Sequence, residues 1–404
     1  MKAVVFHDVG DIRIEDVPEP VIKDTTGAII EVTASAICGS DLHLVRGSVP
    51  GMKPGTIFGH EAVGVVTEVG EDVRNLRRGD RVVVAPTIAC GSCSYCRDGY
   101  FAQCDCANPH GRRAGPAIFG GPKCNGAFDG LQAELARILF ANVGLVKLPD
   151  HVTNDQAILL TDIFPTGYFA AELAEIESGD VVTVYGCGPV GQFAILSAFL
   201  MGAGRVLAVD NVPIRLEAAS AQGAEAINFD DSNPVQAVLD LTRGIGPDRV
   251  IDAVGVRAHG PQQDRDSSLA DDELACMERQ RSQVTAEPWH ESHTLPENAP
   301  TQALAWAVES IAKAGTLAIV GVYPPRFESF PLGKAFEKNL TIKTGVCHHR
   351  RYIPKLMQMV AADAIDISHI LPRQETLLPV AEAYKAFEER ESGWLQVELA
   401  HSNS

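Results

Sequence analysis

The stretch that decides the fold is Val181-Val182-Thr183-Val184-Tyr185-Gly186-Cys187-Gly188-Pro189-Val190-Gly191. Its first five residues, mostly β-branched, suit a buried strand of a parallel sheet. The turn that follows has the form G-x-G-x-x-G, in which the first glycine permits a tight turn, the second lets the backbone approach a pyrophosphate, and the third lets a helix pack closely on the sheet. We therefore predict a dinucleotide site at this turn, formed by Gly186, Gly188, Pro189, Val190 and Gly191; a nucleotide-free sheet with incidental glycines is the alternative.

The sequence after this turn alternates between helical and strand patterns. A helical stretch covers 190–201, and strand-like runs follow at 206–210, 249–254 and 317–321. Strands that alternate with helices are typical of a doubly wound parallel sheet, which places this half of the chain in the α/β class.

Asp210 ends the second of these strands, about twenty residues after the glycine turn. A carboxylate here accepts hydrogen bonds from ribose hydroxyls and repels a 2′-phosphate, so NAD is predicted as the cofactor in preference to NADP. Arg215 lies about one helical turn further on, where it either reaches the adenosine side or is an exposed helix arginine. Val254 and Val322, near the ends of later strands, are further candidates for contact with the cofactor.

Residues 1–155 differ in character, with short β-branched runs at 28–32, 62–70 and 80–84 separated by glycine and proline. This pattern predicts a compact domain that resembles a β-barrel. A chain of 404 residues exceeds the size of most single cores, so two domains are expected. Helical patterns near 351–362 and 379–389 and a strand near 395–399 indicate that the last sixty residues return to the first domain.

Four cysteines, Cys90, Cys93, Cys96 and Cys104, follow the spacing C-x2-C-x2-C-x7-C. Four thiolates so close together can complete a tetrahedral shell around zinc and leave no position for water. The glycines and serines between them suggest a surface loop that a metal must order. We therefore predict a structural zinc lobe over about 90–104; an iron–sulfur cluster or four unrelated thiols are the alternatives.

Cys38, His60 and Asp162 lie in three other distinctive segments, Cys38-Gly39-Ser40-Asp41-Leu42-His43, Gly59-His60-Glu61 and Thr161–Gly167. Together they offer a sulfur, a nitrogen and an oxygen ligand and leave a fourth position open. An open site of this kind is catalytic in type. Each residue alone would more often be an ordinary core or surface residue, so the prediction depends on their combination with the cysteine lobe and the glycine turn.

The net charge of −18 argues against nucleic acid and anionic membranes as partners, since both would repel an acidic surface. No run of eighteen apolar residues is present, and the N-terminus shows neither the apolar core nor the cleavage site of a signal peptide. Ten cysteines, half of them in metal-like spacings, fit a reducing compartment. We expect a cytoplasmic protein.

Residues 257–300 do not fit the alternation of strands and helices, because they are polar and show no sustained apolar period. So long a connection inside a compact domain is usually functional or disordered. A mobile surface insertion and a loop that packs at a subunit contact or over the cofactor are equally compatible with its composition.

The ordered set C-G-S-D-x-H, G-H-E, C-x2-C-x2-C-x7-C, D-x-x-P-T-G-Y and G-x-G-P-V-G resembles the zinc-dependent medium-chain alcohol dehydrogenases over nearly the whole chain. Asp162 and its neighbours are most similar to the glutathione-independent formaldehyde dehydrogenase branch. The resemblance implies a GroES-like catalytic domain of residues 1–161 and 344–404, and a Rossmann coenzyme domain of 162–343 with the 257–300 insertion. It also implies a homo-oligomer, with a tetramer favoured over a dimer.

The resemblance further implies hydride transfer between NAD and a small alcohol or aldehyde held at a zinc ion, with a second, structural zinc in each subunit. Cys38, His60 and Asp162 would hold the catalytic zinc. Ser40 and His43 would carry the proton out, Asp41 would support a histidine ligand, and Glu61 would be a transient ligand or an electrostatic neighbour. The alternatives are an aldehyde dismutase that never releases its NAD, a polyol or amino-alcohol dehydrogenase, and a non-catalytic binding protein.

Overall fold

The computed structural model describes residues 1–47, 49–258, 301–323 and 330–365, together with 367, 370, 373–376, 383–384 and 397–400. It divides into two compact units, unit 1 comprising Met1–Pro165 and Val346–Ser404 and unit 2 comprising Thr166–Gly345. The predicted boundaries lay at 161/162 and 343/344. The two compact units divide between Pro165 and Thr166, so Asp162 lies in unit 1, where its side chain contacts His60 and His349. Nearly all of the predicted insertion, from residue 259 to 300, lies outside the described residues.

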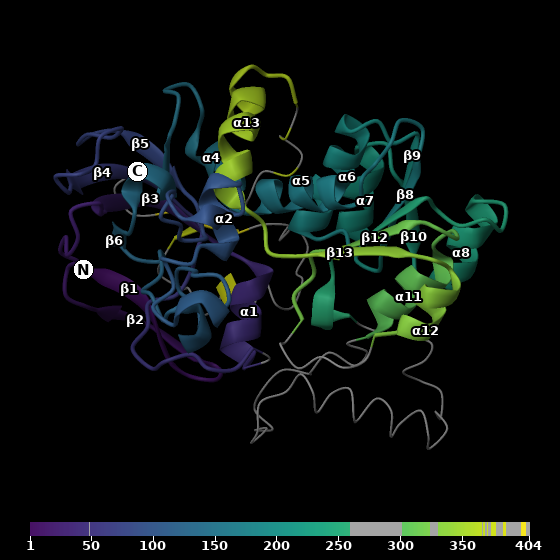
Figure 1. Ribbon diagram of the computed structural model, residues 1–404, viewed down its shortest axis with the longest axis horizontal. Helices are drawn as coiled ribbons and strands as arrows, with labels where there is room; N and C mark the ends of the chain where they lie inside the picture. The colour runs from purple at the N-terminus through teal and green to yellow at the C-terminus, as the bar shows by residue number, and fades with distance from the viewer. Residues whose placement is uncertain are drawn as a thin grey trace. The chain divides into compact units, whose positions relative to one another are not determined.

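Unit 2 is a parallel sheet covered by helices on both faces (Figure 1). Within the described residues its strands follow the order β10-β9-β8-β11-β12-β13, and every neighbouring pair is parallel. This confirms the doubly wound sheet. The elements, in chain order, are β8 (Val181–Tyr185), α6 (Pro189–Leu200), β9 (Arg205–Asp210), α7 (Pro213–Ala221), β10 (Glu225–Asn228), α8 (Pro234–Leu241), β11 (Arg249–Asp252), the 3-10 helix η4 (Gly255–Arg257), α11 (Gln302–Ser310), β12 (Thr316–Ile319), α12 (Leu332–Glu337) and β13 (Thr341–Thr344).

Two apolar clusters, one on each face, hold the sheet of unit 2 between its helices. Val182 and Val184 of β8 pack with Ala194 and Ala198 of α6. Residues of the opposite face, including Tyr185, pack with α8, α11 and α12. Because successive side chains of a strand point to opposite faces, a strand buried on both sides must be apolar nearly throughout, which explains the sequence of β8.

Unit 1 is built on a mainly antiparallel sheet, in which β14 and β15 form a parallel pair. Among the described residues, its main sheet has the order β14-β15-β3-β4-β5-β7, with β6 paired to β3, and β1 and β2 form a separate hairpin. The strands are β1 (Lys2–Asp8), β2 (Asp11–Asp16), β3 (Ala28–Ile37), β4 (Ala62–Val69), β5 (Arg81–Val84), β6 (Leu135–Ile138), β7 (Leu145–Lys147), β14 (Arg373–Thr376) and β15 (Val397–Ala400).

Among the described residues, the helices of unit 1 are short apart from α13, which comes from the C-terminal part of the chain. They are α1 (Gly39–Arg46), α2 (Ser94–Arg97), η1 (Phe101–Gln103), η2 (Gly111–Arg113), η3 (Lys123–Asn125), α3 (Ala141–Gly144), α4 (Asn154–Leu159) and α13 (His349–Ala361). Helix α5 (Ile163–Leu173) contains the boundary between the two units. The return of β15 to pair with β3 places the end of the chain in the first domain. The predicted helix at 379–389 lies almost wholly outside the described residues.

Candidate functional site

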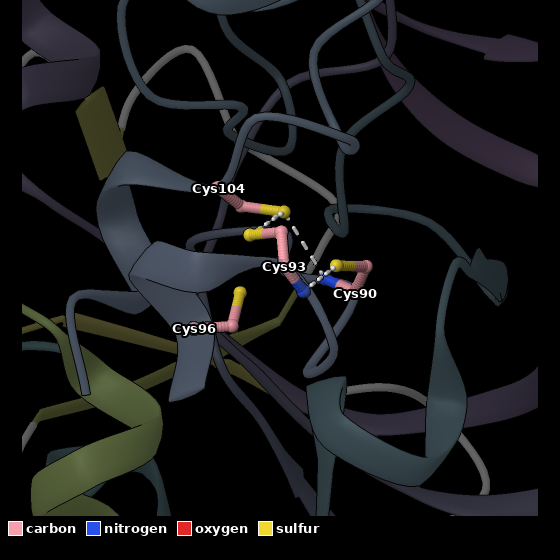
Figure 2. A group of neighbouring side chains, drawn as sticks. All are labelled: Cys90, Cys93, Cys96 and Cys104. Carbon is pink, nitrogen blue, oxygen red and sulfur yellow. Dashed lines mark hydrogen bonds between the residues drawn. The ribbon is translucent and has the colours of Figure 1, made fainter. Parts of the chain in front are cut away.

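The first candidate metal centre is the cysteine lobe. The sulfur atoms of Cys90, Cys93, Cys96 and Cys104 lie within 4.8 Å of one another, and Figure 2 shows how the four side chains gather in one place. Cys93 Sγ lies 3.9 Å from Cys104 Sγ. The backbone N–H of Cys90 donates to Cys104 Sγ at 3.3 Å, and the N–H of Cys93 donates to Cys90 Sγ at 3.4 Å. Backbone donors aimed at sulfur stabilise thiolates, which is the form in which cysteine binds a metal.

The second candidate centre brings together side chains that are far apart in sequence. Ligand atoms of Cys38, His60, Glu61 and Asp162 lie within 4.8 Å of one another. The first three residues are buried, and the side chain of Asp162 is 13% exposed. Oδ2 of Asp162 lies 3.2 Å from Nε2 of His60 and 3.7 Å from Sγ of Cys38. The donor set of one sulfur, one nitrogen and carboxylate oxygens suits zinc.

Local structure positions each of these residues. Cys38 follows β3 directly, at the residue before α1, and its backbone N–H donates to Oδ2 of Asp41 at 2.9 Å. His60 and Glu61 come directly before β4, the neighbour of β3 in the sheet. Asp162 lies between α4 and α5, so three separate backbone segments converge on the centre.

The predicted supporting residues also lie at or near this centre. Oδ1 of Asp41 lies 3.2 Å from Nδ1 of His60, the ring nitrogen on the other side from Asp162. Ser40 Oγ lies 3.4 Å from Nε2 of His60. His43 is buried on the same helix, α1, as Ser40 and Asp41. The hydroxyl of Thr161 donates to Oε2 of Glu61 at 3.3 Å, while Oε1 of Glu61 is buried without a hydrogen-bond partner among the described residues.

Burial governs the electrostatics of the centre. It raises the pKa of the Cys38 thiol to about 12, although a hydrogen bond with His60 acts in the opposite direction. Burial raises the pKa of Glu61 to about 8, and the negative charge of Asp162 is the second largest cause of this rise. For Asp162 burial also disfavours the charged form, but the imidazoles of His349 and His60 outweigh it and hold the pKa of Asp162 well below its ordinary value. A divalent cation would stabilise the thiolate and both carboxylates together.

Two further residues at this centre, His349 and Thr87, were not predicted from the sequence. His349 Nε2 lies 2.7 Å from Oδ1 of Asp162, and Thr87 Oγ1 lies 3.3 Å from Nδ1 of His349. Both side chains are buried. The only signal available was the histidine pair at 348–349, which follows the last strand of the coenzyme domain at the point where the chain was expected to return to the first domain.

The glycine turn of unit 2 has the geometry of a phosphate-binding turn. Gly186 has φ of +87°, and a side chain at Gly191 would place its Cβ 1.8 Å from the carbonyl oxygen of Gly186, so neither position tolerates another residue. Gly188 and Pro189 begin α6, with Val190 in its first turn. The turn therefore presents the N-terminus of a twelve-residue helix, a favourable place for a pyrophosphate.

The other predicted cofactor residues surround the same edge of the sheet. Asp210 at the end of β9 accepts the backbone N–H of Cys187 at 2.7 Å, and Arg215 Nη1 lies 3.8 Å from Oδ2 of Asp210. Val254 comes shortly after β11 and lies close to the glycine turn. A Cβ atom added at Gly186 would lie 2.6 Å from Cγ2 of Val254. The carbonyl of Val322 accepts the N–H of Val256 at 3.0 Å, which ties the segments after β12 and β11 together.

No helix in the described part of the chain is both long enough and apolar enough to cross a membrane.

Comparisons with known proteins agree with this geometry. The profile of the alcohol dehydrogenase GroES-like domain matches residues 24–150, and that of the zinc-binding dehydrogenases matches residues 189–262. An uncharacterised zinc-type alcohol dehydrogenase-like protein of Bacillus subtilis is 36% identical over 383 residues, covering 93% of this chain and 94% of the relative. The glutathione-independent formaldehyde dehydrogenase of Pseudomonas aeruginosa is 31% identical over 408 residues, covering 97% and 95% of the two chains.

Among solved structures, the alcohol dehydrogenase TADH from Thermus sp. ATN1 matches with a TM-score of 0.78 and 32% identity, covering 99% of this chain and all of its own. These similarities extend through both units, from the GroES-like domain to the parallel sheet. The predicted fold class is therefore confirmed, and the chain belongs to the zinc-type medium-chain alcohol dehydrogenase family.

Proposed function

We propose that this protein is an NAD-dependent zinc enzyme that transfers a hydride between a small alcohol, or an aldehyde hydrate, and the nicotinamide ring. The observation that carries the proposal is the convergence of Cys38, His60 and Asp162, three different ligand types from three backbone segments. Three protein ligands leave a coordination position for substrate, whereas the cysteine lobe already supplies four.

A second observation, independent of the ligand types, supports a zinc ion between Cys38, His60 and Asp162. Oε1 of Glu61 is a buried acceptor with no hydrogen-bond partner among the described residues, beside a thiol and a second carboxylate. Buried polar atoms without partners are costly unless something compensates them. A cation held by Cys38, His60 and Asp162 would compensate Glu61, as a neighbour or as a transient ligand.

When bound, zinc would supply the Lewis acidity that lowers the pKa of an alcohol, and NAD would accept the hydride. The protein then has to remove a proton from a buried site. Ser40, whose hydroxyl already reaches the ligand cluster, and His43 on the same helix are the proposed route for this proton. Asp41 would hold His60 in position through its Nδ1 atom.

For the nucleotide, Gly186, Gly188, Pro189, Val190 and Gly191 would hold the pyrophosphate. Asp210 would accept from the ribose hydroxyls, with Arg215 on the adenosine side. Val254 and Val322 would contact the nicotinamide half. The positive φ of Gly186, the contact between Gly191 and Gly186, and the fixed carboxylate of Asp210 support this assignment.

The cysteine lobe would hold a second, structural zinc ion. Its four sulfur ligands close the coordination sphere, so it contributes to stability and not to the chemical step.

We also propose a homo-oligomer, with a tetramer favoured over a dimer. Strand β13 is an edge of the described sheet of unit 2, Ile342 on it is 37% exposed, and Phe336 on the preceding helix α12 is 80% exposed. Edge strands with apolar side chains are ready partners for a second chain. Size-exclusion chromatography with light scattering would measure the number of subunits.

A substrate screen tests the proposed activity. Purified protein with two zinc ions per chain would be incubated with NAD and one substrate at a time, and the formation of NADH would be followed by its absorbance. The substrates would be formaldehyde, short primary alcohols, aromatic alcohols and polyols, and their kcat/KM values would be compared. The relative that is a formaldehyde dehydrogenase makes formaldehyde the first substrate to try. We expect NAD-dependent turnover of at least one class. A zinc-loaded protein that binds NAD but turns over none of them would identify a binding protein instead.

A further inference from the structure

We propose that His349 is a positioning residue that makes Asp162 bind the metal through one oxygen only. This inference rests on the proposed role of Asp162 as a zinc ligand. His349 is the first residue of α13 and lies 187 positions after Asp162 in the sequence.

The two oxygens of Asp162 face different partners. Oδ1 lies 2.7 Å from Nε2 of His349. Oδ2 lies 3.2 Å from Nε2 of His60 and 3.7 Å from Sγ of Cys38, the two other proposed ligands. The carboxylate is therefore held with one oxygen toward the metal centre and the other toward α13.

The imidazole of His349 is itself fixed. A carboxylate only accepts hydrogen bonds, so Nε2 of His349 carries the proton, and the hydroxyl of Thr87 lies 3.3 Å from the other ring nitrogen, Nδ1. His349 is 4% exposed and Thr87 is 2% exposed, so water does not compete for these bonds. The tautomer and the ring orientation are set from both sides.

The start of α13 is also anchored to the cysteine lobe. Nδ1 of His348 accepts the backbone N–H of Ala102 at 3.3 Å, two residues before Cys104. The ring of His348 meets that of Tyr100 edge-on, with 5.3 Å between centroids. His348 therefore contacts the cysteine lobe, and its neighbour His349 contacts the second centre. These two contacts at the start of α13 limit the movement of His349.

The chemical consequence concerns the open coordination position. A carboxylate that binds through both oxygens takes up two positions, whereas a tetrahedral site with three protein ligands needs the fourth for substrate. By holding Oδ1 in a strong hydrogen bond, His349 keeps Asp162 a one-oxygen ligand and leaves that position available. Partners of this kind typically change metal affinity by about 10–100-fold when they are removed.

The test uses His349→Ala, the conservative His349→Gln, and Thr87→Val. Cobalt would be exchanged into the Cys38–His60–Asp162 centre while the cysteine lobe keeps zinc, as metal analysis can verify. Cobalt affinity would be measured by competition with a chelator. The visible absorption of cobalt reports coordination number, because tetrahedral cobalt absorbs strongly and sites of higher coordination absorb weakly.

We expect His349→Ala to lower cobalt affinity by about 10–100-fold and to weaken the absorption, with Thr87→Val changing both in the same direction by less. His349→Gln, whose amide can donate to Oδ1, should restore much of the parent spectrum. His151→Ala is the matched control, because His151 contacts the other end of α13, at the carbonyl of Ala361, and should change neither quantity.

The proposal would be overturned if His349→Ala and Thr87→Val both had the cobalt affinity and the cobalt absorption spectrum of the parent protein. If His349→Ala does not fold, a folded Thr87→Val protein with the cobalt affinity and spectrum of the parent would overturn the proposal on its own. Failure of the proposed function looks different, since the parent protein itself would then bind no cobalt at Cys38, His60 and Asp162.

Discussion

The carboxylate of Asp210 accepts the backbone N–H of Cys187 at 2.7 Å, so the end of β9 is bonded directly to the glycine turn. Its other oxygen accepts the N–H groups of Asn211 at 2.8 Å and Val212 at 2.9 Å. Asp210 therefore shapes the turn at which the pyrophosphate is proposed to bind, in addition to its proposed contact with the ribose.

This relationship gives a prediction about cofactor choice. The parent enzyme should prefer NAD over NADP, and Asp210→Ser should narrow the preference mainly by raising the KM for NAD. Arg215, 3.8 Å from Oδ2 of Asp210, would then lack its carboxylate partner and be able to attract a 2′-phosphate. Activity with NADP should consequently be higher in Asp210→Ser than in the parent enzyme. It should fall again in the double variant that combines Asp210→Ser with Arg215→Ala. Similar parent kcat/KM values for the two cofactors would contradict this account.

Removal of one ligand from the cysteine lobe should reduce stability more than catalysis. We expect Cys104→Ser to lose the lobe zinc and to lower the melting temperature by more than about 5 °C, because binding of a structural metal stabilises the folded state directly. Cys124→Ser, a change at an exposed cysteine of the same unit, is the control. Metal analysis and calorimetry measure the two effects. A Cys104→Ser protein with parent zinc content and melting temperature would rule out a metal in the lobe.

Asp80 provides a prediction about pH. Burial disfavours its charged form, but Lys147 Nζ at 2.6 Å and the N–H of Arg77 at 3.0 Å outweigh it and lower the pKa of Asp80 in the folded protein. A lowered folded-state pKa contributes stability above the unfolded-state pKa, and this stability is lost as the pH falls through the folded-state value.

Asp80→Asn should therefore destabilise the protein at pH 7, by about 1–3 kcal/mol, and the difference from the parent should shrink as the pH drops below about 4. Urea unfolding at several pH values measures it. Asp72→Asn is the control, because its pair with Arg74 is exposed and should contribute little at any pH. A difference that is independent of pH would show that the ionised carboxylate is not the cause.

The features that the sequence could predict were local. The four cysteines of the lobe lie within fifteen residues, and the glycine turn lies between a strand and a helix. The spacing of residues along the chain was therefore enough to predict the metal lobe and the nucleotide turn. The strands at 181–185 and 206–210 were visible because strands buried on both faces must be apolar throughout.

The features that could not be predicted depend on contacts between distant segments. No spacing links Cys38, His60 and Asp162, so they were grouped by their ligand types and their distinctive surroundings, together with the cysteine lobe and the glycine turn, and the family resemblance then supported the group. His349 and Thr87 carry no periodic or motif signal, and their role depends on how α13 packs against the segment after β5. The contacts of Asp162 with His60 and His349 are likewise visible only in the fold.

Metal analysis combined with kinetics of Asp162→Ala tests the central claim most directly. We expect the parent chain to bind two zinc ions, one at each cluster. Asp162→Ala should keep the zinc of the cysteine lobe, lose or bind more weakly the zinc of the Cys38–His60 centre, and show no measurable hydride transfer. An Asp162→Ala protein with near-parent kcat and two bound zinc ions would contradict the central claim.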